Sequence, residues 1–177
     1  MTPVKRVMRL VAVLLFATAS AAARQPVDFS GRWQLVPDTS AAANSARSVP
    51  AMGAGWGSDI SIAQDAATLT IEYATYGRYD MQPPTRLVYR LDGSESTNTI
   101  NTGRGPQEQV SKAAWSGTRL TLTTARTFDD GSGAKPATIT TTQMLSLESP
   151  GTLVVETAHG AALGGKPATS RSVYKKS

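Results

Sequence analysis

The sequence is dominated by short segments in which apolar residues occupy every second position, separated by Gly, Pro, Asp and Ser. Because successive side chains of a β-strand point to opposite faces, this spacing makes one face of each segment apolar and the other polar. A chain that repeats the pattern has to form a sandwich or a barrel to bury its apolar faces. The pattern runs from residues 29–33 to residues 172–176 and predicts an all-β fold.

About ten strands are expected, most of them joined by tight turns such as Asp92-Gly93, a dipeptide typical of hairpins. An antiparallel meander of this length protects its edges best by closing on itself. We therefore predict an up-and-down meander β-barrel of about 8–10 strands, with a Greek-key sandwich as the alternative. The predicted strands cover residues 29–36, 60–63, 69–75, 87–91, 97–101, 108–115, 118–128, 137–148, 152–158 and 169–175.

Two stretches depart from the strand pattern. After the first strand, Asp38 can cap a short helix through the alanines of residues 41–46, which Pro50 ends, so we expect one helix or loop excursion there. Pro83 and Pro84 interrupt the alternation before the segment around Leu87 and Tyr89, and proline cannot donate to a β-ladder.

The first 23 residues are predicted to form a signal peptide. Basic residues precede an apolar stretch at residues 10–16, and small residues offer a cleavage site after Ala21 or Ala23. The uncharged run at residues 10–23 is shorter than the roughly 20 residues that a membrane-spanning helix needs. Cleavage is therefore favoured over an uncleaved anchor, and the protein is expected in the periplasm or outside the cell.

Residues 24–177 have the size of one domain, expected to be a single monomeric barrel without a stable membrane anchor. The chain has no Cys, so neither disulfides nor an acylated N-terminal Cys are available. The formal net charge is +5, but three of the basic residues belong to the signal peptide. The others are scattered without interleaved aromatic residues, which argues against nucleic-acid binding.

The first and last strands carry a family resemblance. The opening Phe-Ser-Gly-Arg-Trp-Gln-Leu at residues 29–35, the excursion after it, nine further strands and the closing segments at residues 152–157 and 171–176 resemble the calycin superfamily. Within it, the chain is most similar to the small exported lipocalin-like proteins of bacteria and to the intracellular fatty-acid-binding proteins. The resemblance implies a β-barrel whose interior holds a small lipophilic ligand.

Fatty-acid-binding proteins typically end in Arg-x-Tyr, whose two side chains grip a carboxylate from the same face. Here Arg171 is three residues before Tyr174, so a regular strand points the two side chains to opposite faces. Ser172 takes the inward place instead. A bulge in this strand is the alternative that restores the pairing.

Arg126 is a second candidate for an anionic ligand. It follows Leu120, Leu122 and Thr124 at every second position, so unbroken alternation places it on the apolar face of its strand. A buried guanidinium requires a polar or anionic partner, such as a ligand carboxylate or phosphate. The alternatives are a bulge that turns Arg126 outward or a solvated position at the barrel mouth.

Three aromatic residues, Tyr73, Tyr89 and Tyr174, are candidate liners of the cavity, although packing in the core explains each of them equally well. Trp33 is expected to plug the base of the barrel. Thr124, Thr141 and Gln143 are also expected to face inward, as is Ser172, and this polar interior suits a cavity better than a dense apolar core. The candidate ligand-binding residues are Arg126, Tyr73, Tyr89, Tyr174 and Ser172.

The sequence contains no convincing catalytic or metal motif. Residues 160–166 have the spacing of a phosphate-binding loop, but Pro167 replaces the hydroxyl residue that holds magnesium. His159 is the only His, which argues against a zinc site and leaves a serine triad without a nucleophile elbow. We therefore expect no enzymatic activity, no cofactor and no metal.

Two classes of function remain. The first is an exported binding protein whose barrel holds a small hydrophobic or amphipathic ligand. The second is a structural or interaction protein of the cell envelope, whose barrel is filled by side chains. The size of the interior decides between them.

Overall fold

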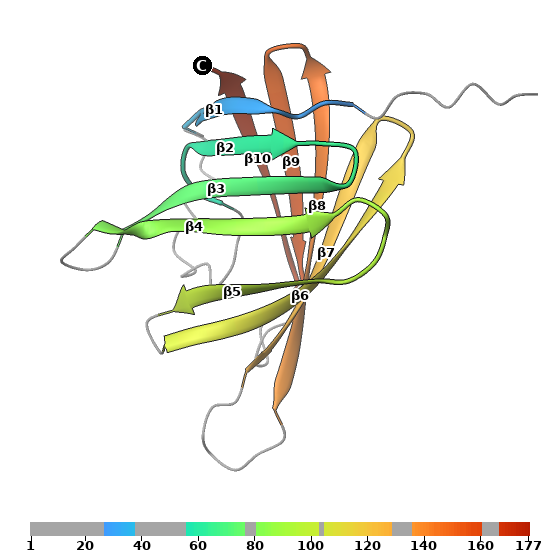
Figure 1. Cartoon of the computed structure of the whole chain (residues 1–177). Helices are drawn as coiled ribbons and strands as arrows, with labels where there is room; N and C mark the ends of the chain where they lie inside the picture. The colour runs from blue at the N-terminus through green and yellow to red at the C-terminus, as the bar shows by residue number, and fades with distance from the viewer. Residues whose placement is uncertain (1–26, 38–55, 77–80, 103–104, 129–135, 161–166) are drawn as a thin grey trace, which may run out of the picture.

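The computed structural model describes residues 27–37, 56–76, 81–102, 105–128, 136–160 and 167–177. These residues form ten β-strands (Figure 1). The predicted signal peptide and the predicted helix after the first strand lie outside the described residues, as does most of the Gly-rich stretch at residues 160–166. The strands are β1 (Gly31–Leu35), β2 (Ile60–Gln64), β3 (Thr68–Tyr76), β4 (Met81–Arg90), β5 (Ser96–Thr102), β6 (Gly105–Ser116), β7 (Arg119–Phe128), β8 (Ala137–Ser149), β9 (Thr152–His159) and β10 (Ala168–Lys176).

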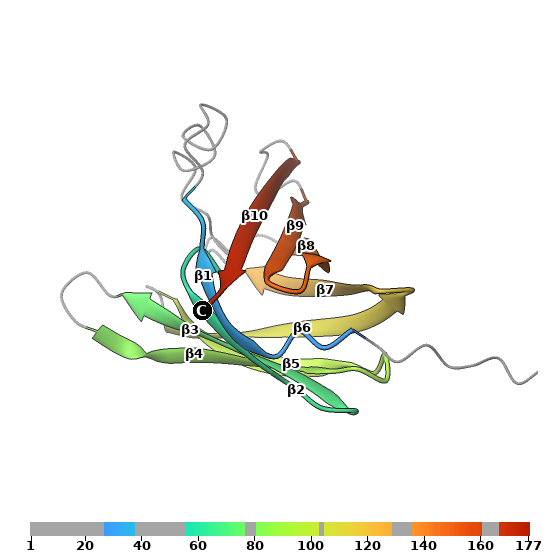
Figure 2. The same cartoon turned by 90° about the horizontal axis from the view of Figure 1, so that it is seen from above.

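All ten strands belong to one antiparallel sheet with the order β4-β3-β2-β1-β10-β9-β8-β7-β6-β5. The sheet curls until its two end strands, β4 and β5, lie against one another, and seen from above β9 and β10 rise away from β2 to β6 (Figure 2). The predicted meander barrel is confirmed, because β1 pairs with both β2 and β10, and every other ladder joins consecutive strands. No helix among the described residues is long and apolar enough to cross a membrane.

The alternating pattern positions the strands as predicted. In β7 the even-numbered residues from Leu120 to Arg126 are buried, while the odd-numbered residues between them are more exposed. The turn at residues 64–67 reverses the chain between β2 and β3, and Asp65 accepts hydrogen bonds from the backbone N–H groups of Ala67 and Thr68 at 2.7 and 2.6 Å. Local turn chemistry and strand period therefore agree in this part of the barrel.

Two details of β4 differ from the predictions. The strand continues through Pro83 and Pro84, which the sequence analysis treated as an interruption. The prolines are tolerated because β4 ends the sheet and its register with β3 shifts between Tyr73 and Thr75, next to them. The turn at Asp92-Gly93 forms, with Gly93 at φ 81°, but the strands that it joins do not form a hairpin ladder.

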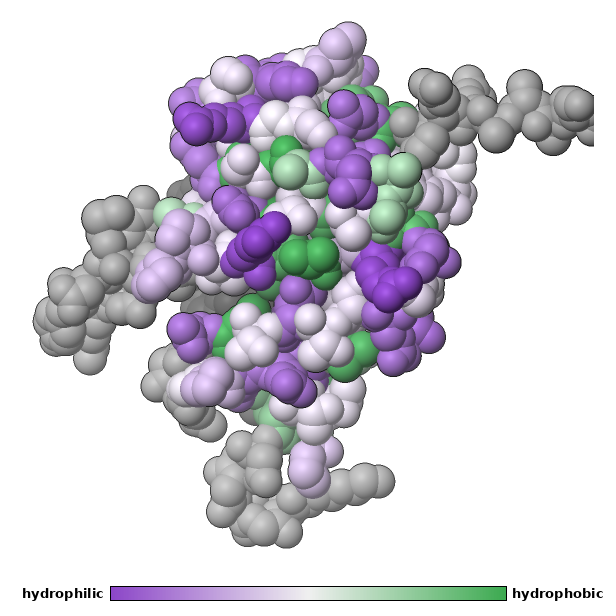
Figure 3. All heavy atoms as spheres, in the orientation of Figure 1, coloured by the Kyte–Doolittle hydropathy of each residue, from purple (hydrophilic) through white to green (hydrophobic). Residues whose placement is uncertain are grey.

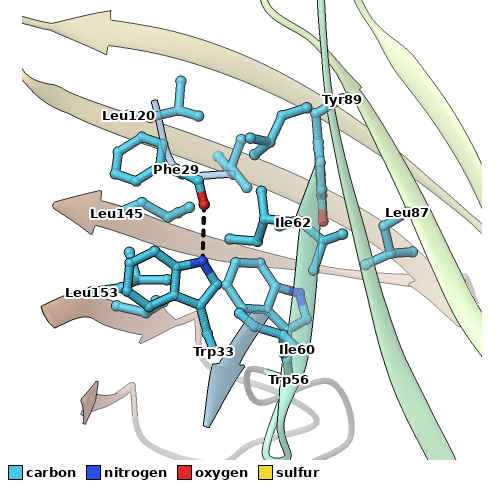
Figure 4. Close-up of a cluster of buried hydrophobic side chains, with 14 of the residues drawn as sticks. Phe29, Trp33, Trp56, Ile60, Ile62, Leu87, Tyr89, Leu120, Leu145 and Leu153 are labelled. Carbon is cyan, nitrogen blue, oxygen red and sulfur yellow. Dashed lines mark hydrogen bonds between the residues drawn. The ribbon is translucent and has the colours of Figure 1, made fainter. Parts of the chain in front are cut away.

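The hydrophobic core fills one end of the barrel (Figure 4). Trp33 is 1% exposed, and its indole N–H donates to the Phe29 carbonyl at 2.9 Å, which satisfies the one polar group of the ring. Phe29 stacks on Trp115 with the ring centroids 5.9 Å apart. The side chains that pack around Trp33 include Phe29, Ile60, Ile62, Leu120, Leu145 and Leu153.

Candidate ligand pocket

The interior of the barrel changes from apolar to polar along four neighbouring strands. Along β7 the inward residues are first Leu120 and Leu122, then Thr124 and Arg126. The strand registers bring the polar parts of the four strands side by side, because each inward polar residue is paired with a polar or small residue on at least one adjacent strand. The inward polar residues of β6 to β9 are Gln109, Ser111, Thr124, Arg126, Thr141, Gln143, Thr157 and His159.

A pocket lies at this polar end, with a cavity volume of about 60 Å³. The cavity is therefore larger than a single buried water needs and has room for a small polar group. Its lining combines polar side chains with aromatic and aliphatic ones. The lining residues are Trp56, Tyr73, Leu87, Tyr89, Ile100, Gln109, Thr124, Arg126, Ile139, Thr141 and Gln143.

Arg126 faces the interior, as strand alternation predicted, and is 9% exposed. No bulge interrupts β7 on either side, since its registers with β6 and β8 are continuous through this residue. The guanidinium carbon lies 4.6 Å from the centroid of the Phe128 ring, a cation–π distance. Burial lowers the pKa of Arg126, but its usual value is so high that the side chain stays positively charged at neutral pH.

Tyr73 and Tyr89 lie in the same pocket as Arg126. Burial raises the pKa of Tyr73, while a hydrogen bond with Thr85 and the positive charge of Arg126 oppose this shift. Burial also raises the pKa of Tyr89, and the nearby Tyr73 adds to the effect. Both tyrosines are therefore neutral at physiological pH and present hydroxyl groups beside a cation.

Tyr174 and Ser172 do not line this pocket. Tyr174 is 1% exposed and packs in the apolar core, where burial raises its pKa. Ser172 is half-buried and lies two residues before Tyr174 on the same strand, so both residues face the interior as predicted. Arg171 is exposed and pairs with Glu148 at 2.5 Å, so no Arg171–Tyr174 carboxylate grip forms.

Five pocket residues were not predicted from the sequence to line a cavity: Trp56, Leu87, Ile100, Gln109 and Ile139. Gln109 and Ile139 have a sequence signal, because each is paired directly with Arg126 on a neighbouring strand and shares its face. Trp56 follows a Gly-rich stretch outside the strand pattern, so nothing in the sequence indicates that it is 5% exposed.

Two buried polar atoms near this end have no hydrogen-bond partner among the described residues, Gln107 Oε1 and His159 Nε2. His159 Nδ1 lies 3.2 Å from the Thr141 hydroxyl, which also lines the pocket. Burial lowers the pKa of His159, so its imidazole is neutral at pH 7. The polar end therefore keeps unused hydrogen-bonding capacity, which a polar ligand can satisfy.

The described lining carries a net positive charge, because Arg126 is its one formally charged side chain. Together with tyrosine and threonine hydroxyls and two glutamine amides, it offers many hydrogen-bond donors. Such an arrangement recognises a carboxylate, sulfonate or phosphate, or a neutral group rich in acceptors. Within the described part of the chain, no three His, Cys, Asp or Glu residues are grouped so that they could hold a metal ion.

Comparison of the sequence with protein-family models gives no match, and comparison with curated proteins gives none either. The pocket and the barrel geometry therefore carry the functional argument.

Proposed function

We propose that the protein is a non-enzymatic binding protein that holds a small amphipathic ligand with an anionic or acceptor-rich head group. The observation that carries the proposal is the placement of Arg126 in a pocket beside neutral tyrosines and glutamine amides. A charged group withdrawn from water stabilises an anion more strongly than an exposed one, because the surrounding protein screens it less.

The size of the pocket indicates how a ligand would be arranged. A volume of about 60 Å³ suits a head group but not a long acyl chain. Apolar residues of the same lining, such as Trp56, Leu87 and Ile100, offer contacts for the apolar part of the ligand. The other end of the barrel is occupied by the core around Trp33, so we propose that the bound ligand occupies only the polar end.

We also propose that the protein is a lipocalin-like member of the calycin superfamily and that it is exported from the cytoplasm. The meander barrel is compatible with a lipocalin-like protein, and the basic and apolar segments at the N-terminus support a signal peptide. A catalytic role is not proposed. The Thr141 hydroxyl and His159 are close to each other, but a nucleophile–base pair also needs a group that orients the imidazole, and His159 Nε2 has no such partner among the described residues.

A structural or interaction protein with a filled barrel is the alternative, and the small size of the pocket favours it. The surface of the protein gives the structural or interaction alternative less support. Among the described residues, Val36 and Val110 are the large hydrophobic side chains that are exposed. On the face that carries β2 to β6, hydrophilic and hydrophobic residues are mixed without a broad hydrophobic patch (Figure 3).

Native mass spectrometry of protein purified from the periplasm of its own organism tests this proposal. We expect a bound amphipathic molecule that organic extraction releases and that adds mass to the folded protein. Protein that carries no ligand and does not bind an anionic hydrophobic dye, such as anilinonaphthalene sulfonate, would support the filled-barrel alternative instead.

A further inference from the structure

The barrel has one seam at which no backbone ladder joins the neighbouring strands. β4 and β5 are the two ends of the sheet, and they lie against one another (Figure 1). Every other neighbouring pair is joined by a backbone ladder. Side chains replace the ladder at this seam, although the turn at Asp92-Gly93 connects the two strands directly.

Asn98 and Ser96 of β5 provide the replacement. The Asn98 carboxamide accepts a hydrogen bond from the Val88 N–H at 2.8 Å and donates one to the Val88 carbonyl at 3.0 Å. Ser96 Oγ accepts from the Arg90 N–H at 2.7 Å. Asn98 and Ser96 are each 7% exposed. We call these three hydrogen bonds the seam clip.

The pocket lies directly behind the seam clip. Leu87 and Tyr89, on either side of Val88, line the pocket from β4. Ile100, two residues after Asn98 and on the same face of β5, lines it from the other side of the seam. The side chains of β4 and β5 therefore form a wall of the pocket, and among the described residues the seam clip joins the two strands of this wall through hydrogen bonds.

We propose that the seam between β4 and β5 is a lateral gate, and that the ligand reaches the Arg126 pocket when the seam clip opens. The inference rests on the proposed function, because it assigns a route to that pocket. Three side-chain hydrogen bonds open more readily than a ladder of many backbone bonds, since opening them does not unfold a strand. β4 keeps its ladder with β3, and β5 keeps its ladder with β6, while the gate is open.

Hydrogen exchange of full-length protein tests whether the seam clip behaves as a gate. In Asn98→Ala the Val88 amide should exchange roughly threefold to tenfold faster, the effect of losing one hydrogen bond. In Ser96→Ala the Arg90 amide should respond in the same way. Thr99→Ala is the matched control, because Thr99 is exposed on the same strand. Exchange at Leu122, which is buried in the core on β7, reports global unfolding and should stay unchanged.

Stopped-flow binding of anilinonaphthalene sulfonate tests whether this gate admits a ligand. Asn98→Ala should raise the association and dissociation rates by a similar factor and leave the dissociation constant within about twofold, because Asn98 does not line the pocket. Asn98→Asp, which keeps the acceptor and loses the donor, should fall between Asn98→Ala and the wild type. Thr99→Ala should match the wild type.

The outcomes separate the two proposals. In Asn98→Ala, Val88 could exchange faster while the association and dissociation rates of the dye stay unchanged. If the dye still binds the Arg126 pocket in that case, the entry route is wrong and the proposed function stands. If Val88 exchange does not change in Asn98→Ala, the seam clip is not a gate. If no variant binds the dye, the proposed function and the entry route both fail.

Discussion

Arg126 of β7 faces the pocket, and its orientation could be predicted from the sequence, although its neighbours from distant strands could not. Its inward orientation follows from strand period alone, because β7 runs without a bulge. Its neighbours do not follow from the same argument. Tyr73 comes from β3, more than fifty residues earlier in the chain, and only closure of the barrel brings the two side chains into one pocket. Local alternation thus predicts which face a residue occupies, but not which distant residues share its cavity.

His159 allows a prediction about pH at the same scale. Burial holds the pKa of His159 below its usual value of 6.5, so between the two values the unfolded chain binds more protons than the folded protein. His159 therefore contributes full stability above about pH 6.5, and this contribution is lost as the pH falls. We expect thermal denaturation of His159→Gln to show a smaller loss of stability between about pH 7 and pH 5 than the wild type. An identical pH dependence in both proteins would contradict this.

At the scale of elements, turns and strands were largely predictable, whereas one pairing was not. The segments from β6 to β10 follow the predicted order, and each pairs with the next along the chain. The turn at Asp92-Gly93 was expected to make a hairpin, and it makes the seam instead. Ser96 and Asn98 are buried polar residues on the inward face of β5, of which only Asn98 falls within the strand predicted at residues 97–101. They can bridge the two strands only because β4 and β5 are the ends of the sheet. The alternation of residues along a strand does not show which strands lie at the ends.

The turn between β2 and β3 carries a prediction about Asp65. Hydrogen bonds from the N–H groups of Ala67 and Thr68 and from the Thr68 hydroxyl lower the pKa of this carboxyl group. Because its pKa is depressed in the folded state, Asp65 stabilises the protein above the usual value of 3.8, and the stabilisation is lost as the pH falls through the folded value.

Asp65→Ala should therefore lower the melting temperature at pH 7, with a smaller loss below pH 3.8, where the stabilisation by the wild-type carboxylate decreases as the pH falls. Glu108→Ala, at an exposed position of β6, is the control and should change the melting temperature little. Equal losses in Asp65→Ala at both pH values would show that the turn does not depend on the charge of Asp65.

At the scale of the whole molecule, the barrel divides into a filled end and a polar end. Trp33 and the surrounding aliphatic residues close one end, as the sequence indicated. The polar end holds Arg126 in a cavity that is too small for a complete lipid. The sequence predicted a polar interior from Thr124, Thr141 and Gln143 but not its volume, because volume depends on how side chains from all ten strands pack together.

Titration of anilinonaphthalene sulfonate into the wild type, Arg126→Gln and Arg119→Gln tests the central claim most directly. Arg119 lies on the same strand but is exposed, so it controls for the loss of one positive charge. Arg126→Gln should weaken binding by on the order of 1.5–3 kcal/mol, the worth of a hydrogen bond to a charged group, and Arg119→Gln should bind like the wild type. Equal affinities in all three proteins would show that Arg126 does not hold an anionic ligand.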